Sequence, residues 1–225
     1  MPWNILCDFD GTVVPVDVSD ALFERFAEPA WRDIEADWQA ERISSRTCME
    51  RQVALLRCSL AELDATLDSI DIDPGFAGFV GDCRRWGHRL TIVSDGLDYA
   101  IRRIFRRHGI HDLAVVANHL RPAGDRRYVL EFPHASRICS SGVCKCGFRG
   151  PRVPTLVIGD GRSDFCVAGA ADMVIAKASL LDHCRRDGLP VIPFDDFAQV
   201  RAVVDHLGRH QRRVAARIPE WSSVP

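Results

Sequence analysis

Short apolar runs, most of them ending in Gly, Asp, Ser or Pro, recur along the chain and have the length and boundaries of buried strands. They cover residues 4–7, 90–93, 113–117, 155–158, 173–176 and 189–192. Apolar residues with helical spacing fill several of the intervals, at residues 99–108, 164–170 and 197–207. Strands that alternate with helices predict an α/β fold, with a parallel sheet that carries helices on both faces.

A long stretch near the N-terminus follows a different pattern. From about residue 15 to residue 85 no strand-like run appears, and the apolar residues keep helical spacing. Ser59 and Glu62 form the sequence signature of a capping box, which marks the start of one of these helices. We therefore predict a helical cap domain at residues 15–85, inserted into an α/β core domain made of residues 1–14 and 86–225.

Residues 121–154 are the least regular part of the chain. Gly124-Asp125 predicts a hairpin turn near its start, and prolines and glycines that break helices gather toward its end. Three of the nine cysteines and a histidine also lie here, at Cys139, Cys144, Cys146 and His134. These four side chains could bind structural zinc, although the usual Cys-x2-Cys spacing is missing. Reduced loop cysteines without a metal are the other interpretation.

Composition narrows the class of protein. The chain has 225 residues, 47% of them hydrophobic and 27% charged, with a net charge of −2. These values are typical of a globular protein with no overall attraction to nucleic acid or to an anionic membrane. No run approaches the roughly 18 apolar residues of a membrane span, and Met-Pro-Trp-Asn does not resemble a signal peptide, so we expect a cytoplasmic location.

Acidic residues follow three of the predicted strands. Asp8-Phe-Asp10-Gly-Thr12 follows the first, Ser94-Asp95-Gly96 the second and Gly159-Asp160-Gly-Arg-Ser-Asp164 the fourth. Ligands bind at the carboxyl ends of parallel strands, so neighbouring strands would gather these acids at one edge. Crowded carboxylates need a cation, and Mg²⁺ prefers oxygen ligands. We expect Asp8, the backbone carbonyl of Asp10 and Asp160 to hold Mg²⁺, with Asp164 behind them.

These motifs, taken with a lysine between the second and the last, resemble the four ordered motifs of the haloacid dehalogenase superfamily. The resemblance covers most of the chain and implies a Rossmann-like core. It also implies that Asp8 is the nucleophile, forming an aspartyl-phosphate, and that Asp10 is the general acid and base. The phosphate would be bound by Ser94, by the backbone N–H groups of Asp95 and Gly96 at a helix N-terminus, and by the lysine.

Only two lysines occur in the chain, Lys145 and Lys177, and the order of the motifs selects Lys145. Fourteen residues separate it from Asp160, and Pro151 and Pro154 interrupt the helix that carries this lysine in the superfamily. Lys177 reads instead as a solvated residue at the end of a strand.

A second catalytic interpretation starts from cysteine. Residues 146–152 fit the Cys-x5-Arg phosphate loop of cysteine-dependent phosphatases. Such a loop should join a strand to a helix, and the same two prolines, Pro151 and Pro154, disfavour that helix.

The small helical insert resembles the cap of the phosphoserine phosphatase group. That group grips its amino acid with a Glu seven residues after the second catalytic Asp and with an Arg in the third cap helix. Here Asp17 occupies the first place and Gln52 the second, with Arg51 adjacent. Gln52 cannot supply the charged, bidentate fork that an arginine gives a carboxylate.

Other features resemble the methionine-salvage phosphatases of the same superfamily. They are Asp17, residues 41–44, the Pro133-His134 step before the cysteines, and residues 181–184. We therefore expect a magnesium-dependent phosphatase for a small phosphorylated metabolite, with 2-hydroxy-3-keto-5-methylthiopentenyl-1-phosphate as the first candidate and apolar cap residues such as Phe23 and Trp38 against it. The alternatives are a phosphoserine phosphatase, a phosphotransferase, a cysteine-dependent phosphatase and a non-catalytic metal-binding protein.

Overall fold

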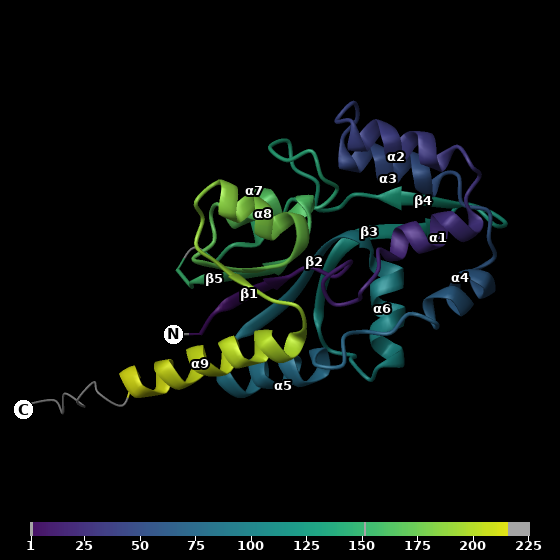
Figure 1. The fold of residues 1–225 in the computed structure, drawn as a ribbon. Coiled ribbons are helices and arrows are strands. Elements are labelled where there is room, and N and C mark those ends of the chain that lie inside the picture. Colours follow the sequence, from purple (N-terminus) through teal and green to yellow (C-terminus); the bar gives the residue numbers. More distant parts are fainter. Residues whose placement is uncertain (1, 151, 216–225) are drawn as a thin grey trace, which may run out of the picture.

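The computed structural model describes residues 2–150 and 152–215 (Figure 1). Within these residues the strands form one seven-stranded sheet in the order β4-β3-β2-β1-β5-β6-β7. The strands are β1 (Asn4–Cys7), β2 (Arg89–Leu97), β3 (Ala114–Pro122), β4 (Tyr128–Glu131), β5 (Thr155–Gly159), β6 (Met173–Ala176) and β7 (Val191–Pro193). All neighbours pair in parallel except β3 and β4, which are antiparallel and enclose the predicted turn at 124–125. The predicted fold class is confirmed.

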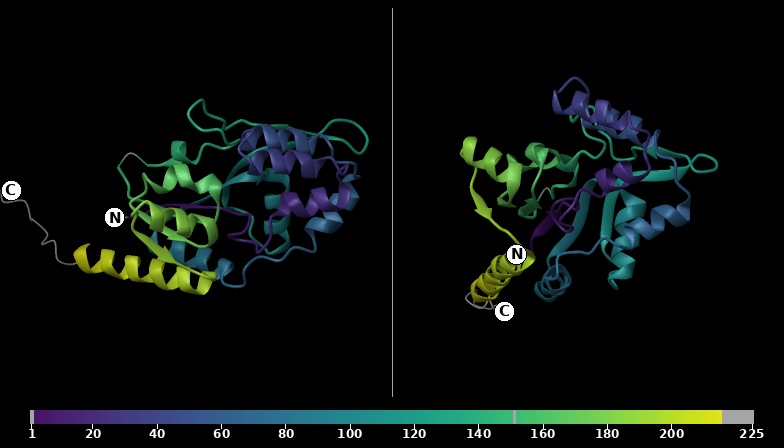
Figure 2. Two further views of the ribbon diagram at one scale, coloured as in Figure 1. Left: turned by 45° about the horizontal axis from the view of Figure 1, so that its top comes forward. Right: turned by 45° about the vertical axis from the view of Figure 1, so that its right-hand side comes forward.

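Helices cover both faces of this sheet (Figures 1 and 2). They are α1 (Val18–Phe26), α2 (Trp31–Gln39), α3 (Ser45–Val53), α4 (Leu60–Leu67), α5 (Phe76–Trp86), α6 (Asp98–Arg107), α7 (Phe165–Ala168), α8 (Ala178–Arg186) and α9 (Phe197–Ala215), with 3₁₀ turns η1 (Lys145–Phe148) and η2 (Arg162–Asp164). The capping box of Ser59 and Glu62 is present at the start of α4.

The alternation of side chains along the central strands produces two apolar layers. Ile5 and Cys7 of β1 point into the larger cluster, which includes residues of α5, α6 and α9. Leu6 points to the opposite face, where Val143 and Val167 cover it. Successive strand residues face opposite sides of a sheet, so this short strand is apolar throughout because both of its faces are buried.

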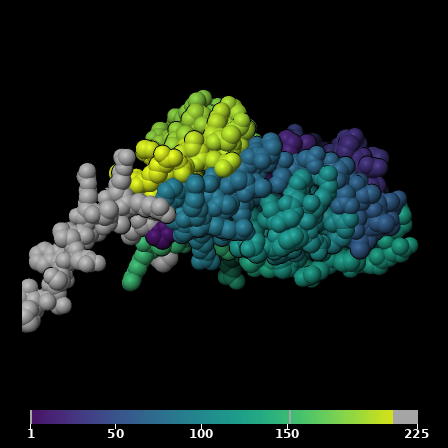
Figure 3. All heavy atoms as spheres, turned by 90° about the horizontal axis from the view of Figure 1, so that it is seen from below, coloured from purple at the N-terminus to yellow at the C-terminus, as the bar shows by residue number. Residues whose placement is uncertain are grey.

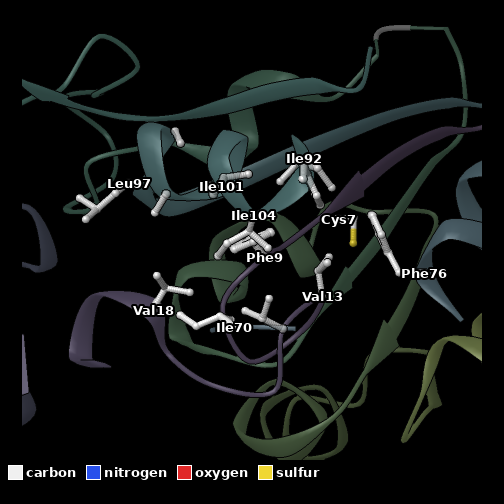
Figure 4. Close-up of a cluster of buried hydrophobic side chains, with 14 of the residues drawn as sticks. Cys7, Phe9, Val13, Val18, Ile70, Phe76, Ile92, Leu97, Ile101 and Ile104 are labelled. Atoms are coloured by element: carbon white, nitrogen blue, oxygen red, sulfur yellow. The ribbon is translucent and has the colours of Figure 1, made fainter. Parts of the chain in front are cut away.

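Phe9 anchors the turn after β1 in the larger cluster (Figure 4). Its ring meets Phe105 edge-on at 5.3 Å, Phe105 stacks on Phe76 at 5.6 Å, and Phe76 contacts Phe197 at 5.0 Å. The residue between Asp8 and Asp10 is therefore tied through aromatic contacts to α6, α5 and α9. This packing fixes the backbone that carries both acids.

The inserted helices divide between two surroundings. Residues of α2 and α3 pack on each other, and α3 also contacts β4. In contrast, α5 packs along α9 and against β2. Figure 3 shows the yellow atoms of α9 beside the blue atoms of α5, seen from below. We therefore propose that the cap ends before Phe76 and that α5 belongs to the core, because its apolar face is covered by core elements.

Two boundaries differ from those that the sequence predicts. Strand β2 runs on through Leu97, with an irregular register to β3 between Val93 and Leu97, and α6 begins at Asp98. Ser94, Asp95 and Gly96 thus lie in the irregular end of a strand and not at a helix N-terminus. Helix α9 also runs further than the predicted residue 207.

Candidate active site

The site lies where the chain changes direction across the sheet. Strands β2, β3 and β4 extend from β1 toward one edge, while β5, β6 and β7 extend toward the other. In open α/β sheets, ligands bind outside the carboxyl ends of the strands at such a switch point. Asp8 directly follows β1, and Asp160 directly follows β5, its neighbour. The topology therefore brings the first and last acidic motifs side by side.

Lys145 joins these motifs. Its side chain is only 2% exposed, and its ammonium donates hydrogen bonds to Asp8 Oδ1 and to Asp164 Oδ1, both at 2.7 Å. Burial works against the charged form, but Asp164 and Asp8 outweigh it and raise the pKa of Lys145. The shortened loop therefore places this lysine, as a cation, between the two acids.

Carboxylate oxygens of Asp8, Asp160 and Asp164 all lie within 4.8 Å of one another. Asp164 Oδ2 is buried without a hydrogen-bond partner, and Thr12 Oγ1 donates to Asp160 Oδ1 at 2.9 Å. Burial and the charge of Asp8 raise the pKa of Asp160 to about 6. An unpartnered buried oxygen among crowded carboxylates is the donor set of a hard divalent cation, so these residues fit Mg²⁺.

Asp10 lies beside this cluster in a different environment. Its Oδ1 accepts from the Val18 backbone N–H at 2.9 Å, and its Oδ2 accepts from Ser94 Oγ at 3.3 Å. Burial raises the pKa of Asp10 well above its ordinary value, and the charge of Asp17 raises it further. A raised pKa favours the protonated carboxyl, and a protonated carboxyl can act as a general acid.

Glycines make the close approach of these acids possible. A Cβ on Gly11, whose φ is +68°, would collide with the Asp160 carboxylate, and a Cβ on Gly159 would collide with that of Asp164. Gly11 thus leaves room for an acid of the last motif, and Gly159 leaves room for an acid of its own motif.

Asp95 makes contacts that the motif did not indicate. Its carboxylate accepts hydrogen bonds from the Val143 backbone N–H at 2.9 Å, from Ser45 and from Asn118. It therefore connects the cap, the Lys145 loop and strand β3. The Gly96 N–H donates to Ser94 Oγ at 2.9 Å, so Ser94 also supports the turn that would bind phosphate.

A cavity of about 830 Å³ opens between this edge of the sheet and the cap. Asp17 lines it and caps α1, while Gln52 lines it and donates to Glu35 at 3.0 Å. Arg51 is exposed and is not part of the cavity wall. Position 52, not 51, therefore faces the site.

The cap residues expected at the substrate differ in placement. They were expected to contact the substrate only where they face the site. Trp38 lines the cavity and meets this condition, whereas Phe23 is fully buried in the apolar core and does not. Sequence reasoning also missed the partner of Trp38, because Arg162 reaches across from the core and lies 5.3 Å from its ring. The only sequence signal for a place of Arg162 at this site was its position within the last acidic motif.

The cysteine-dependent interpretation does not match the structure. Cys146 lies inside the 3₁₀ turn η1, not at the end of a strand, and the described residues from Arg152 to Pro154 form no helix. Pro151 itself lies outside the described residues. Burial and the neighbouring Cys166 raise the pKa of the Cys146 thiol to about 11, which disfavours the nucleophilic thiolate.

Lys177 follows β6 and lies half-buried with its ammonium 5.0 Å from the centre of the Phe194 ring. It is a residue at the end of a strand, as predicted, but packs on an aromatic ring.

None of the helices among the described residues combines the length and apolar character needed to cross a bilayer.

Comparison with known proteins agrees with this geometry. Over residues 5–169 the chain matches the family of haloacid dehalogenase-like hydrolases. It is 28% identical to the 2-hydroxy-3-keto-5-methylthiopentenyl-1-phosphate phosphatase of an Exiguobacterium species. The aligned region covers 90% of this chain and 97% of that relative. It is 32% identical to the enzyme of the same name from Geobacillus thermodenitrificans, and this alignment covers 91% of this chain and 95% of that relative.

Two solved structures of phosphoserine phosphatase share the fold. The substrate-bound structure has a TM-score of 0.66 at 20% identity and covers 89% of this chain and 97% of that one. The structure with an analogue of the phospho-aspartyl intermediate has a TM-score of 0.68 at 19% identity and covers 91% and 98%. At these identities the likeness concerns the fold alone.

The raised pKa of Asp160 predicts a pH-dependent effect of Asp160→Asn on stability without metal. As pH rises from about 4 to about 6, the folded wild type resists ionising Asp160, whereas its unfolded chain ionises freely, so the wild type loses stability. The variant lacks this ionisation. In urea unfolding with chelator, the free energy of unfolding of the variant minus that of the wild type should therefore increase by about 1–3 kcal/mol across this pH range. A difference that stays flat with pH would contradict the burial of this charge.

Proposed function

Because this chain belongs to the haloacid dehalogenase-like hydrolases, we propose that it hydrolyses a small phosphate monoester with the help of magnesium, through a phosphorylated Asp8. The observation that carries this proposal is the buried Lys145, held between Asp8 and Asp164 at the switch point of the sheet. We further propose 2-hydroxy-3-keto-5-methylthiopentenyl-1-phosphate as its substrate, since relatives that cover nearly the whole chain carry that name. The cytoplasmic location stays a prediction.

Magnesium would be held by Asp8, the backbone carbonyl of Asp10, Asp160 and Asp164, and would neutralise charge on the phosphoryl oxygens. Lys145 adds a fixed positive charge at the same place. Because Lys145 occupies Asp8 Oδ1, the attack on phosphorus falls to Asp8 Oδ2.

The reaction would proceed in two displacements at phosphorus. Asp8 Oδ2 forms a bond to phosphorus while the bond to the substrate oxygen breaks, and Asp10 gives its proton to that leaving oxygen. Asp10 is then a carboxylate and takes a proton from water as the water attacks the same phosphorus. The bond between Asp8 and phosphorus breaks, and inorganic phosphate leaves. The raised pKa of Asp10 suits it to hold the proton before the first displacement.

The cavity wall indicates which ester fits. An amino acid phosphate needs a free cation for its carboxylate, but Gln52 is neutral and already bonded to Glu35. The arginines of the wall are engaged elsewhere, since Arg42 pairs with Asp37 at 2.7 Å and Arg162 lies on Trp38. An uncharged, partly apolar tail beside Trp38 therefore suits the cavity better than phosphoserine.

The experiment that tests the reaction is phosphate release by wild type, Asp8→Asn and Asp10→Asn, each with magnesium and with chelator. Asp8→Asn should abolish turnover, because an amide cannot form the acyl-phosphate, and Asp10→Asn should slow it by roughly 10²–10⁴. Asp125→Asn, on the exposed β3–β4 turn, is the matched control and should keep full activity. Activity of Asp8→Asn within tenfold of wild type, or full activity in chelator, would contradict the proposal.

Substrate choice can be tested by kinetics with the two esters. We expect kcat/KM for the enol phosphate to exceed that for phosphoserine by at least about tenfold, equivalent to about 1.4 kcal/mol of transition-state binding. Arg51→Ala should leave this ratio unchanged, because Arg51 is exposed outside the cavity. If phosphoserine is the better substrate and Arg51→Ala removes that activity, Arg51 is a carboxylate clamp and the assignment is wrong.

A further inference from the structure

Three thiols meet beside the active site, on the loop between β4 and β5, and the thiol-bearing Cys166 of α7 lies next to this loop. The thiols of Cys139, Cys144 and Cys146 lie within 4.8 Å of one another, and the Sγ atoms of Cys139 and Cys144 are 3.2 Å apart. Helix α7, which carries Cys166, packs on η1, which carries Cys146, and Cys166 lines the same cavity as Cys139. The structure thus gathers three sulfur atoms on the loop, with Cys166 of a second segment beside them.

This set has the chemistry of a structural zinc site. Tetrahedral zinc takes four ligands with Zn–S bonds of about 2.3 Å, which places the sulfur atoms about 3.8 Å from one another. Cys144 is buried, Cys139 and Cys146 are half-buried, and Cys166 is exposed, so the site is open enough for an ion to enter. Each thiol that binds zinc releases its proton to solvent.

His134 is not part of this set, although the sequence suggested it as a ligand. Its ring packs against Phe148 at 5.6 Å and His119 at 6.4 Å, and its backbone carbonyl accepts from the Cys144 N–H at 3.1 Å. Cys166, twenty residues downstream of Cys146, takes the place that His134 was expected to fill.

The loop that carries these cysteines is long and has little secondary structure of its own. Between Glu131 and Thr155 the described residues contain only the four-residue turn η1. Loops of this length without secondary structure are uncommon inside a compact domain. Yet this loop must hold Lys145 in a fully desolvated position, and Lys145 lies directly between Cys144 and Cys146.

We propose that Cys139, Cys144, Cys146 and Cys166 bind one zinc ion, which fastens the Lys145 loop to α7. The ion would join Cys144 and Cys146, which flank Lys145, to Cys166. Cys166 lies two positions beyond Asp164, which accepts one of the hydrogen bonds of Lys145. Zinc would thereby hold this lysine in a fixed position, as a helix does elsewhere in the superfamily. The zinc site is distinct from the magnesium site proposed above at Asp8, Asp160 and Asp164, because the two sites share no ligand.

A disulfide between Cys139 and Cys144 is the alternative for the closest pair of thiols. It would account for one short contact, but it would leave Cys146 and Cys166 gathered around it without a role. Zinc uses all four sulfurs, and a disulfide is therefore an outcome that the experiment must separate.

The experiment is a metal count on the full chain, purified with reductant and without chelator, then dialysed against excess magnesium to clear the carboxylate site of adventitious ions. We expect one zinc per chain. Cys166→Ser should bind zinc at least about tenfold more weakly in competition with a colorimetric chelator, since one of four bonds is lost. Cys166 is exposed, so this variant should fold.

Two controls separate this site from other thiols and from the acids. Cys184→Ser removes a buried cysteine outside the cluster and should keep its zinc, as should Asp160→Asn. Hydrogen exchange at residues 139–150 should speed up when zinc is removed from the wild type. These readouts do not depend on phosphatase activity.

Zinc well below one equivalent after reconstitution with zinc under reductant would overturn the proposal. An intact mass 2 Da lower, with a Cys139–Cys144 peptide cross-link, would assign a disulfide instead. Zinc lost from Asp160→Asn but kept by Cys166→Ser would place the ion at the carboxylates and would equally overturn it.

Discussion

The buried ammonium of Lys145 is the interaction on which the site depends. A charge removed from water is costly unless it is paired and hydrogen-bonded, and removing one partner of such a pair leaves an uncompensated charge. Here Lys145 has two partners, Asp8 and Asp164, each at 2.7 Å. When ionised, Asp8, Asp160 and Asp164 carry three negative charges and Lys145 cancels one. The remaining charge of −2 matches one divalent cation, so the lysine and a bound metal would together neutralise the cluster before the anionic phosphate arrives.

The rest of the fold holds these groups in register. The switch point sets β1 beside β5 and so brings Asp8 next to Asp160, while the aromatic contacts of Phe9 fix the turn between Asp8 and Asp10. Asp95 connects the site to the cap. Its carboxylate accepts hydrogen bonds from Ser45 of α3 and from the backbone N–H of Val143, two residues before Lys145. The half-buried carboxylate of Asp95 therefore links helix α3 directly to the loop that carries the lysine.

Much of this architecture could be predicted from the sequence, because it depends on local patterns. Apolar runs with sharp boundaries marked the strands, and the acids directly after them needed only the rule that parallel strands share a carboxyl edge. Lys145 was identified by its order among the motifs, although two prolines argued against its usual helix. Ion pairs decided its position, and these come from residues far apart in the chain.

What could not be predicted depends on tertiary contacts. The apolar face of α5 has the same helical spacing as those of the cap helices, and only α9 shows that it packs on the core. Cys166 carries no spacing signal toward Cys146, and Arg162 gives no sign that it crosses to Trp38. The end of β2 was misjudged because Ser-Asp-Gly also suits a helix cap, whereas Asp95 is held by Asn118 and Val143 and the strand continues.

The most direct measurement compares Lys145→Met with Lys177→Met, the two lysines of the chain. Methionine keeps the length of the side chain and removes its charge. With magnesium present and folding verified by circular dichroism, the central role of Lys145 predicts that its replacement lowers kcat/KM at least about 100-fold, the usual worth of a fixed charge at a developing transition state. The Lys177 variant should stay within about tenfold of wild type, or 1.4 kcal/mol. Near-normal turnover by Lys145→Met would contradict the account.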